Sequence, residues 1–126
     1  MKREQIVTDK CAPCFGPYPQ GIKMGNMIFT AQVALDAKGE IVPGGIKEQT
    51  RAVMENAKLV LEAAGASFDN LAMVTIHLTD LSLGKEMNEV YAGYFPDGNY
   101  PCRCCTQCGA LSEGFLVEMA FTAIAD

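Results

Sequence analysis

The spacing of apolar residues predicts two helices in this chain. Between Ile46 and Ala64 apolar residues recur at steps of three and four, the period of an amphipathic helix. Gly65 follows at once and suits the position just after a helix end, where a left-handed backbone is common. A shorter helix is predicted over residues 87–94, because the breaker sequence that begins at Pro96 follows it.

Alternation of apolar and polar residues predicts strands elsewhere. Residues 73–79 and 115–125 alternate in this way, and residues 101–110 form a further strand region. Residues 22–24 and 27–33 flank Gly-Asn, a dipeptide typical of tight hairpins. The predicted order is β-β-α-β-α-β-β, an α+β sheet with both helices on one face.

The segment before Gly21 is predicted to be an irregular loop, since Pro13, Pro17 and Pro19 exclude a helix there. No linker and no internal repeat divides the rest of the chain. A chain of 126 residues has the usual length of one domain, so residues 1–126 are taken as a single domain.

Charge and hydropathy narrow the class of protein. The net charge is −5 and the ten basic residues are scattered, which argues against a nucleic-acid-binding surface. The N-terminus lacks the apolar core of a secretory signal, and no apolar stretch approaches the ~20 residues that span a bilayer. We therefore expect a soluble, cytoplasmic protein.

Six cysteines form two clusters, and their thiols are expected to be reduced in that compartment. The spacings Cys11-x-x-Cys14 and Cys105-x-x-Cys108 superficially resemble a zinc site. In a strand, however, Cys102 and Cys104 share one face while Cys105 takes the other, so the thiols do not converge. The favoured interpretation is small buried apolar side chains and no metal, with a redox or chaperone function as an alternative.

Three polar side chains are candidates for chemistry. Arg103 lies in a strand of apolar and thiol side chains, and its fork of donors suits a carboxylate; a structural ion pair explains it equally well. His77, the only histidine, has no evident catalytic partner in the sequence. Tyr18 is flanked by two prolines, which points to a packed loop aromatic or a phenol displayed at the surface.

At these residues the sequence resembles the YjgF/Rid family, also called the reactive intermediate deaminase or L-PSP endoribonuclease family. The resemblance covers nearly the whole chain, and it rests on the order and spacing of short segments rather than on any one of them. The segments are GPYPQG at 16–21, FTAQ at 29–32, QTRAVMEN at 49–56, LEAAG at 61–65, NEVY at 88–91, and YPCR at 100–103 followed by Cys105.

The resemblance implies a chorismate-mutase-like protomer that assembles into a homotrimer with ligand clefts between subunits. It also implies a 2-iminobutanoate/2-iminopropanoate deaminase, which hydrolyses reactive enamines and imines to 2-oxo acids and ammonia. No metal or organic cofactor is implied, and the partners are a small 2-imino or 2-oxo acid and further copies of the chain.

Site residues follow from the matching positions. Arg103 matches the arginine that grips the substrate carboxylate, and Cys105 matches a position whose backbone frames the cleft. Tyr18 matches a loop tyrosine at the cleft, Thr30 a small hydroxyl residue, and Asn88 a substrate-binding position. Gln32 also fits the family pattern, while Ala31 replaces a more usual glycine.

One departure bears on catalysis. The family usually carries a glutamate directly before Ala-Ile-Ala, thought to position the hydrolytic water, whereas this chain has Thr122. Glu118 shares that strand face, but at about 13 Å along the strand it does not simply substitute. A threonine hydroxyl can hydrogen-bond a water but cannot take its proton. Carboxylate binding without turnover is therefore one alternative. A second, independent alternative is an endoribonuclease acting on single-stranded RNA.

Overall fold

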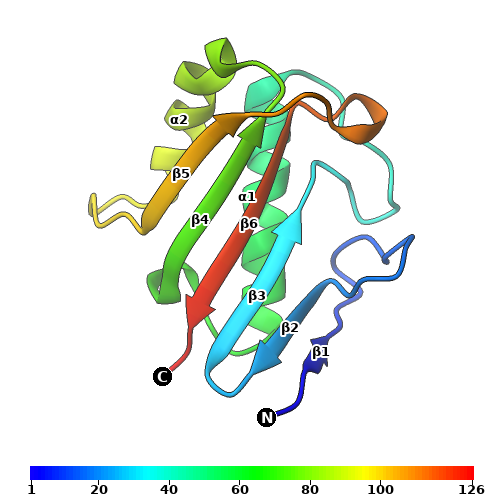
Figure 1. Cartoon of the computed structure of the whole chain (residues 1–126), viewed down its shortest axis with the longest axis vertical. Coiled ribbons are helices and arrows are strands. Elements are labelled where there is room, and N and C mark those ends of the chain that lie inside the picture. The colour runs from blue at the N-terminus through cyan, green and yellow to red at the C-terminus, as the bar shows by residue number, and fades with distance from the viewer.

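Six strands form one mixed sheet in the computed structural model, which describes residues 1–126 (Figure 1). The strand order is β1-β2-β3-β6-β4-β5, and β4 and β5 are parallel while all other neighbours are antiparallel. The elements are β1 Glu4–Ile6, β2 Gly21–Met24, β3 Met27–Gln32, α1 Ile46–Ala63, β4 Leu71–Leu78, α2 Gly84–Ala92, β5 Cys102–Gln107 and β6 Val117–Ile124.

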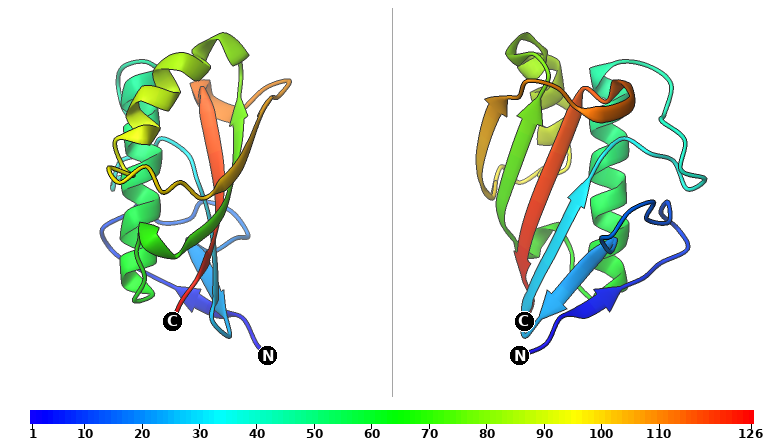
Figure 2. Two further views of the ribbon diagram at one scale, coloured as in Figure 1. Left: turned by 90° about the vertical axis from the view of Figure 1, so that its left-hand side faces the viewer. Right: turned by 45° about the vertical axis from the view of Figure 1, so that its right-hand side comes forward.

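Both helices cover the same face of the sheet, as the sequence predicts (Figure 2). The longer helix, α1, turns its apolar stripe onto β3 and β6, with Val53, Ala57 and Val60 fully buried. It ends as predicted: Gly65 has φ of +80°, and the amide of Ala66 returns to the carbonyl of Leu61 at 2.8 Å. This bond satisfies a carbonyl that the helix end would otherwise leave unpaired.

The last strand, β6, lies inside the sheet between β3 and β4 and sorts its side chains by strict alternation. Val117, Met119 and Phe121 are buried beneath the helices. Glu118 and Thr122 lie on the opposite face and are half-buried. The predicted division of this strand into two faces is confirmed.

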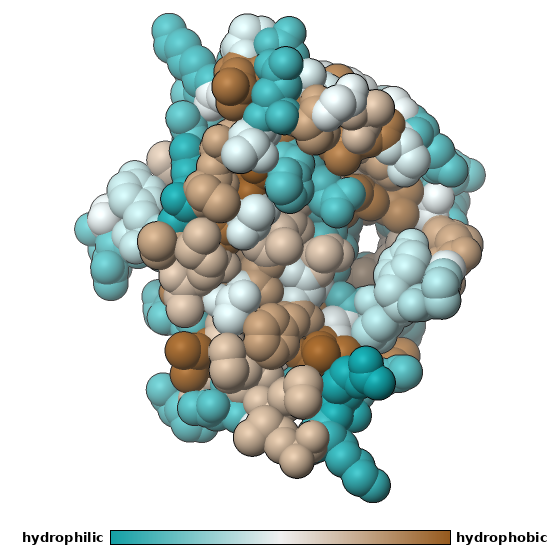
Figure 3. Space-filling model, in the orientation of Figure 1, coloured by the Kyte–Doolittle hydropathy of each residue, from teal (hydrophilic) through white to brown (hydrophobic).

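The face away from the helices is uncovered in the single chain. Apolar residues gather on this face (Figure 3), and the pair Met27 and Ile124, where β3 begins and β6 ends, is 38% and 45% exposed. A face of this kind on a sheet is normally covered by another layer, because packing it removes apolar surface from water.

The prediction that the whole segment before Gly21 is an irregular loop is wrong at the N-terminus. Glu4–Ile6 is a strand, β1, which pairs with β2 so that Ile6 lies opposite Gly21. Only Ile6 of its three residues is buried, so the segment carries no alternation that a pattern could detect. Other strand limits differ by a few residues: β4 begins at Leu71, β5 spans Cys102–Gln107, and β6 begins at Val117.

Candidate functional site

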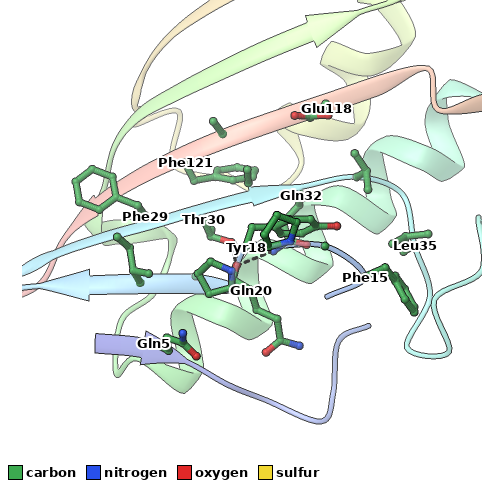
Figure 4. A pocket seen from close by; sticks show the side chains of 18 of the residues that line it. Gln5, Phe15, Tyr18, Gln20, Phe29, Thr30, Gln32, Leu35, Glu118 and Phe121 are labelled. Atoms are coloured by element: carbon green, nitrogen blue, oxygen red, sulfur yellow. Dashed lines mark hydrogen bonds between the residues drawn. The ribbon is translucent and has the colours of Figure 1, made fainter. Parts of the chain in front are cut away.

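A cavity opens where the loop before β2 passes over the edge of β3 (Figure 4). Strand β2 begins at Gly21, opposite Thr30. Beyond Thr30, β3 is therefore paired only with β6, and its other edge is open. Tyr18, Thr30 and Thr122 all line this cavity, from the loop, β3 and β6 respectively. The cavity thus reaches three of the predicted site residues, although Thr30 pairs with the buried Phe121 and turns its side chain to the helix side, whereas Thr122 faces the open side of the sheet.

Gln20 fixes the loop that forms the cavity wall. Its side-chain amide donates to the carbonyls of Thr8 at 3.0 Å and Ala12 at 2.9 Å, and its Oε1 accepts from the amide of Thr8 at 2.8 Å. Its own carbonyl accepts from the hydroxyl of Thr30 at 2.7 Å. These bonds tie the irregular segment to the sheet although it has no regular structure of its own.

The hydroxyl of Thr30 takes part in this framework. It donates to Gln20 and accepts from Nε2 of Gln32 at 2.8 Å, as the dashed lines of Figure 4 show. Thr30 is 6% exposed. Its hydroxyl hydrogen is thus already used, and only its remaining lone pair is free for a ligand.

Tyr18 lies at the mouth of the cavity with 59% of its surface exposed. Its ring folds back over Gly16, where an added Cβ would come within 2.7 Å of the ring. The amide of Tyr18 donates to the carbonyl of Gly16 at 2.9 Å. A residue without a side chain at position 16 is therefore what allows the tyrosine to adopt this position.

Arg103 is held at the opposite edge of the sheet, on β5. Its Nη2 donates to Oδ1 of Asn88 on α2 at 2.6 Å. Its Cζ lies 4.8 Å from the centre of the Tyr91 ring, within the range of a cation–π contact. Tyr91 is buried, and its hydroxyl has no hydrogen-bond partner.

Cys105 lies on the same side of β5 as Arg103, because the two residues are two positions apart in a strand. It is half-buried, and burial raises the pKa of its thiol while Arg103 opposes that rise. A thiol with a raised pKa is protonated near neutral pH and is a poor nucleophile. The side chain of Cys105 is therefore not an activated group, which leaves its predicted backbone role.

Arg103, Asn88 and Cys105 do not reach the cavity within one chain. Strands β4 and β6 separate β5 from β3, so Arg103 and Thr30 are three strand spacings apart, roughly 14 Å. The predicted site residues thus form two groups at different parts of the sheet. One group comprises Tyr18, Thr30 and Thr122, and the other comprises Asn88, Arg103 and Cys105.

Thr122 and Glu118 both face the cavity from β6. Thr122 lies opposite Phe29 of β3, and its hydroxyl makes no hydrogen bond within the chain. Glu118 lies farther along the strand, toward the loop that precedes β6 (Figure 4). The carboxylate therefore shares the cavity with Thr122 but stands apart from it along the strand.

The prediction that the cysteines are small buried side chains is wrong for two of the six. Cys11 is buried and contacts the carbonyl of Asn56, as expected of a small apolar side chain, but Cys102 and Cys104 are exposed. They lie on the uncovered face of β5, an edge strand with one neighbour, so nothing in the chain covers them. No group of three or more His, Cys, Asp or Glu side chains is placed to hold a metal ion.

His77 has a partner that the sequence did not reveal. Its Nδ1 lies 3.1 Å from the hydroxyl of Thr106, its neighbour across the parallel pair of β4 and β5.

Two residues that support the site, Gln20 and Tyr91, were not predicted from the sequence. For Tyr91 a signal exists: it follows Asn88 by three positions, so the two share one face of α2.

Comparison with known proteins gives this arrangement its context. The sequence model of the family described as Endoribonuclease L-PSP matches residues 9–125. The chain belongs to this family, the YjgF/Rid family. It is 46% identical to a RutC family protein of Pyrococcus abyssi, over 94% of each chain. It is also 36% identical to the 2-iminobutanoate/2-iminopropanoate deaminase of Mus musculus, over 97% of this chain and 91% of that protein.

Solved structures of Rid proteins share the fold. The crystal structure of TdcF of E. coli with bound serine has a TM-score of 0.92 and 33% identity, covering 98% of this chain and 99% of that one. RidA from an Antarctic Psychrobacter has a TM-score of 0.91 and 35% identity, covering 97% and 99%. The α+β Rid fold is therefore confirmed. No helix is both long enough and apolar enough to cross a membrane.

Proposed function

We propose that this Rid-family protein hydrolyses enamines and imines of small 2-oxo acids, such as 2-iminobutanoate and 2-iminopropanoate. The observation that carries the proposal is the state of Arg103, whose guanidinium is half-exposed and bonded to a neutral amide. Such a group can bind the carboxylate that these substrates share. The names of the mouse and rat relatives, both 2-iminobutanoate/2-iminopropanoate deaminases, support the same reaction class.

The reaction makes modest chemical demands. Water adds to the C=N carbon of the imine, the nitrogen takes up a proton, and the resulting carbinolamine loses ammonia to give the 2-oxo acid. An enamine first takes a proton at carbon to become the imine. Because the substrate nitrogen is itself basic, the protein needs mainly to hold the carboxylate and to present a water molecule. Orientation of this kind can contribute several kcal/mol, up to about 7–11 kcal/mol.

In this proposal Arg103 binds the carboxylate and the hydroxyl of Thr122 accepts a hydrogen bond from the attacking water. Tyr18 and Thr30 close the opposite wall of the site, and the backbone at Cys105 frames the cleft. No metal or organic cofactor takes part. Without a carboxylate at position 122, the water is oriented but is not deprotonated by the protein.

We further propose that the complete site forms between subunits of a homotrimer. Arg103 lies at the β5 edge, whereas Tyr18, Thr30 and Thr122 line a cavity beside β3. A site that contains both groups requires that the β5 edge of one copy approach the cavity of another. The uncovered apolar face of the sheet offers surface for such an assembly.

The activity is tested by the decay of 2-aminoacrylate that a pyridoxal-phosphate-dependent dehydratase generates. The protein is expected to accelerate this decay, and Arg103→Ala is expected to lower the acceleration at least about tenfold, because a charge-assisted carboxylate contact is lost. Arg51→Ala is the matched control, since Arg51 is an exposed arginine on α1 that makes no ion pair. Equal activity of Arg103→Ala and wild type would disprove the role of Arg103.

The assembly is tested by mixing two inactive variants. Arg103→Ala and Tyr18→Ala change different groups of the site, so subunits mixed after dissociation are expected to regain part of the activity. Sedimentation analysis should give the mass of three chains. Failure of the mixture to recover activity, while the mixed assembly forms, would place both groups of each site on one chain.

A second candidate is carboxylate binding without turnover, which the threonine at position 122 favours. It predicts that 2-oxobutanoate binds through Arg103 while 2-aminoacrylate decays at its spontaneous rate.

Cleavage of single-stranded RNA is the remaining alternative. The net charge of −5 counts against it, and RNA cleavage that Arg103→Ala abolishes would support it.

A further inference from the structure

The partner of Arg103 is unusual in carrying no charge. Nη2 of Arg103 donates to the amide oxygen of Asn88 at 2.6 Å, and this is the only hydrogen bond of the guanidinium within the chain. The single ion pair of the structure joins Lys47 to Glu89 at 3.0 Å. No carboxylate of the chain therefore neutralises Arg103, although fifteen Asp and Glu residues are present.

The second support of Arg103 is also uncharged. The ring of Tyr91 lies under the guanidinium at 4.8 Å and is 3% exposed, so it is packed in place by the core. Asn88 and Tyr91 are three positions apart on α2 and face β5 together. One contact fixes an edge of the guanidinium and the other supports its plane, which leaves its remaining N–H donors unused.

We propose that Asn88 is a positioning and specificity-determining residue: it fixes the guanidinium of Arg103 through a neutral amide and so leaves the positive charge available to an anionic ligand. This inference rests on the proposed function of Arg103 as a carboxylate anchor. It differs from the expectation that Asn88 itself contacts the ligand, because here Asn88 acts through Arg103.

Replacement of the amide by a carboxylate distinguishes these roles. Asn88→Asp retains an acceptor oxygen at nearly the same place, so the guanidinium remains fixed. The new negative charge neutralises Arg103 and repels a carboxylate ligand. We expect the affinity for 2-oxobutanoate, measured by calorimetric titration of the full chain, to fall at least about tenfold.

A neutral ligand separates charge from structure. The uncharged analogue 2-oxobutanamide should bind to Asn88→Asp and to the wild-type protein with affinities within about twofold, since it carries no charge for the introduced carboxylate to repel. A role of Asn88 in folding alone would weaken both ligands equally. Asn88 is exposed on α2, and circular dichroism verifies that each variant retains its fold.

Two further variants distinguish the effect of losing the acceptor at position 88 from the effect of adding a negative charge. Asn88→Ala removes the acceptor without adding charge, so the guanidinium loses its fixed orientation and affinity for 2-oxobutanoate should fall less than in Asn88→Asp. Asn26→Asp makes the same chemical change in the exposed turn between β2 and β3, and should leave affinity within about twofold of the wild type.

The outcomes separate this inference from the proposed function. If Arg103→Ala binds 2-oxobutanoate as well as the wild type does, the anchor itself is wrong. If Arg103→Ala abolishes binding while Asn88→Asp binds within about twofold of the wild type, the neutrality of position 88 has no function. An Asn88→Asp variant that loses the acid and the amide equally, or that loses less affinity than Asn88→Ala, also overturns the inference.

Discussion

The hydroxyl of Thr30 donates a hydrogen bond to the backbone carbonyl of Gln20, 2.7 Å away. This bond joins the buried side of β3 to the end of the loop that carries Tyr18. Gln20 in turn holds Thr8 and Ala12 through its side chain, so one contact connects the sheet with most of the irregular N-terminal segment. The wall of the cavity is thereby part of the folded framework.

Thr30→Val is expected to lower the free energy of unfolding by about 1–3 kcal/mol, because it removes the two hydrogen bonds of the Thr30 hydroxyl and leaves only the long bond, 3.5 Å, from Nε2 of Gln32 to the carbonyl of Gln20. Urea denaturation at one fixed protein concentration measures this change, since assembly alters apparent stability. Thr75→Val is the control: Thr75 is half-buried on β4 and its hydroxyl makes no hydrogen bond within the chain. Equal stability of the two variants would contradict the role of Thr30.

Thr122→Glu is expected to raise the turnover number for imine hydrolysis. A carboxylate on the cavity side of β6 can take a proton from the attacking water, and a positioned general base typically contributes about 10²–10⁴-fold. The variant Thr122→Gln matches the new side chain in size but provides no base, so it should not show this gain. An increase of the same size in both variants would assign the effect to the shape of the cavity.

Two glycines are expected to respond in opposite directions to alanine. Gly65 has φ of +80°, so Gly65→Ala should destabilise the protein by about 1 kcal/mol or more. Gly84 begins α2 with φ of −61°, and an added Cβ would meet Leu78 at an ordinary 4.0 Å. Gly84→Ala should therefore stabilise by about 0.4–1 kcal/mol. Denaturation midpoints that move in the same direction would refute this interpretation of the backbone.

Alkaline pH is expected to destabilise the protein through Tyr94. Burial raises the pKa of this phenol, and its hydrogen bond to Glu55, 2.6 Å long, raises it further. The pKa is thus higher in the folded than in the unfolded chain, where it is about 10. The associated stability is complete below about pH 10 and is lost as pH rises further.

The urea midpoint should accordingly fall as the pH is raised above about 10. Tyr94→Phe should reduce that fall, and Glu55→Gln, which removes the charge but retains an acceptor, should give an intermediate result. A Tyr94→Phe variant whose midpoint falls as steeply as that of the wild type would show that other groups cause the alkaline loss.

Local patterns in the sequence were sufficient for most of the regular structure. The helix that begins at Ile46, its end before Gly65, the hairpin at Gly25 and the two faces of β6 are all confirmed. Each depends on residues close together in the chain, where the period of the apolar side chains and the backbone freedom of glycine decide the conformation. The same patterns identified Arg103 as an unusual charge in its strand.

Only the tertiary structure decided how distant segments meet. The pairing of β1 with β2, the place of β5 at the edge and the exposure of Cys104 all depend on strand order, which no local pattern encodes. The sequence left Arg103 open between a structural ion pair and a ligand anchor. Its neighbours in the fold are a neutral amide and an aromatic ring from α2, because the parallel pairing of β4 and β5 brings that helix against it. The charge of Arg103 is therefore held in place without being neutralised.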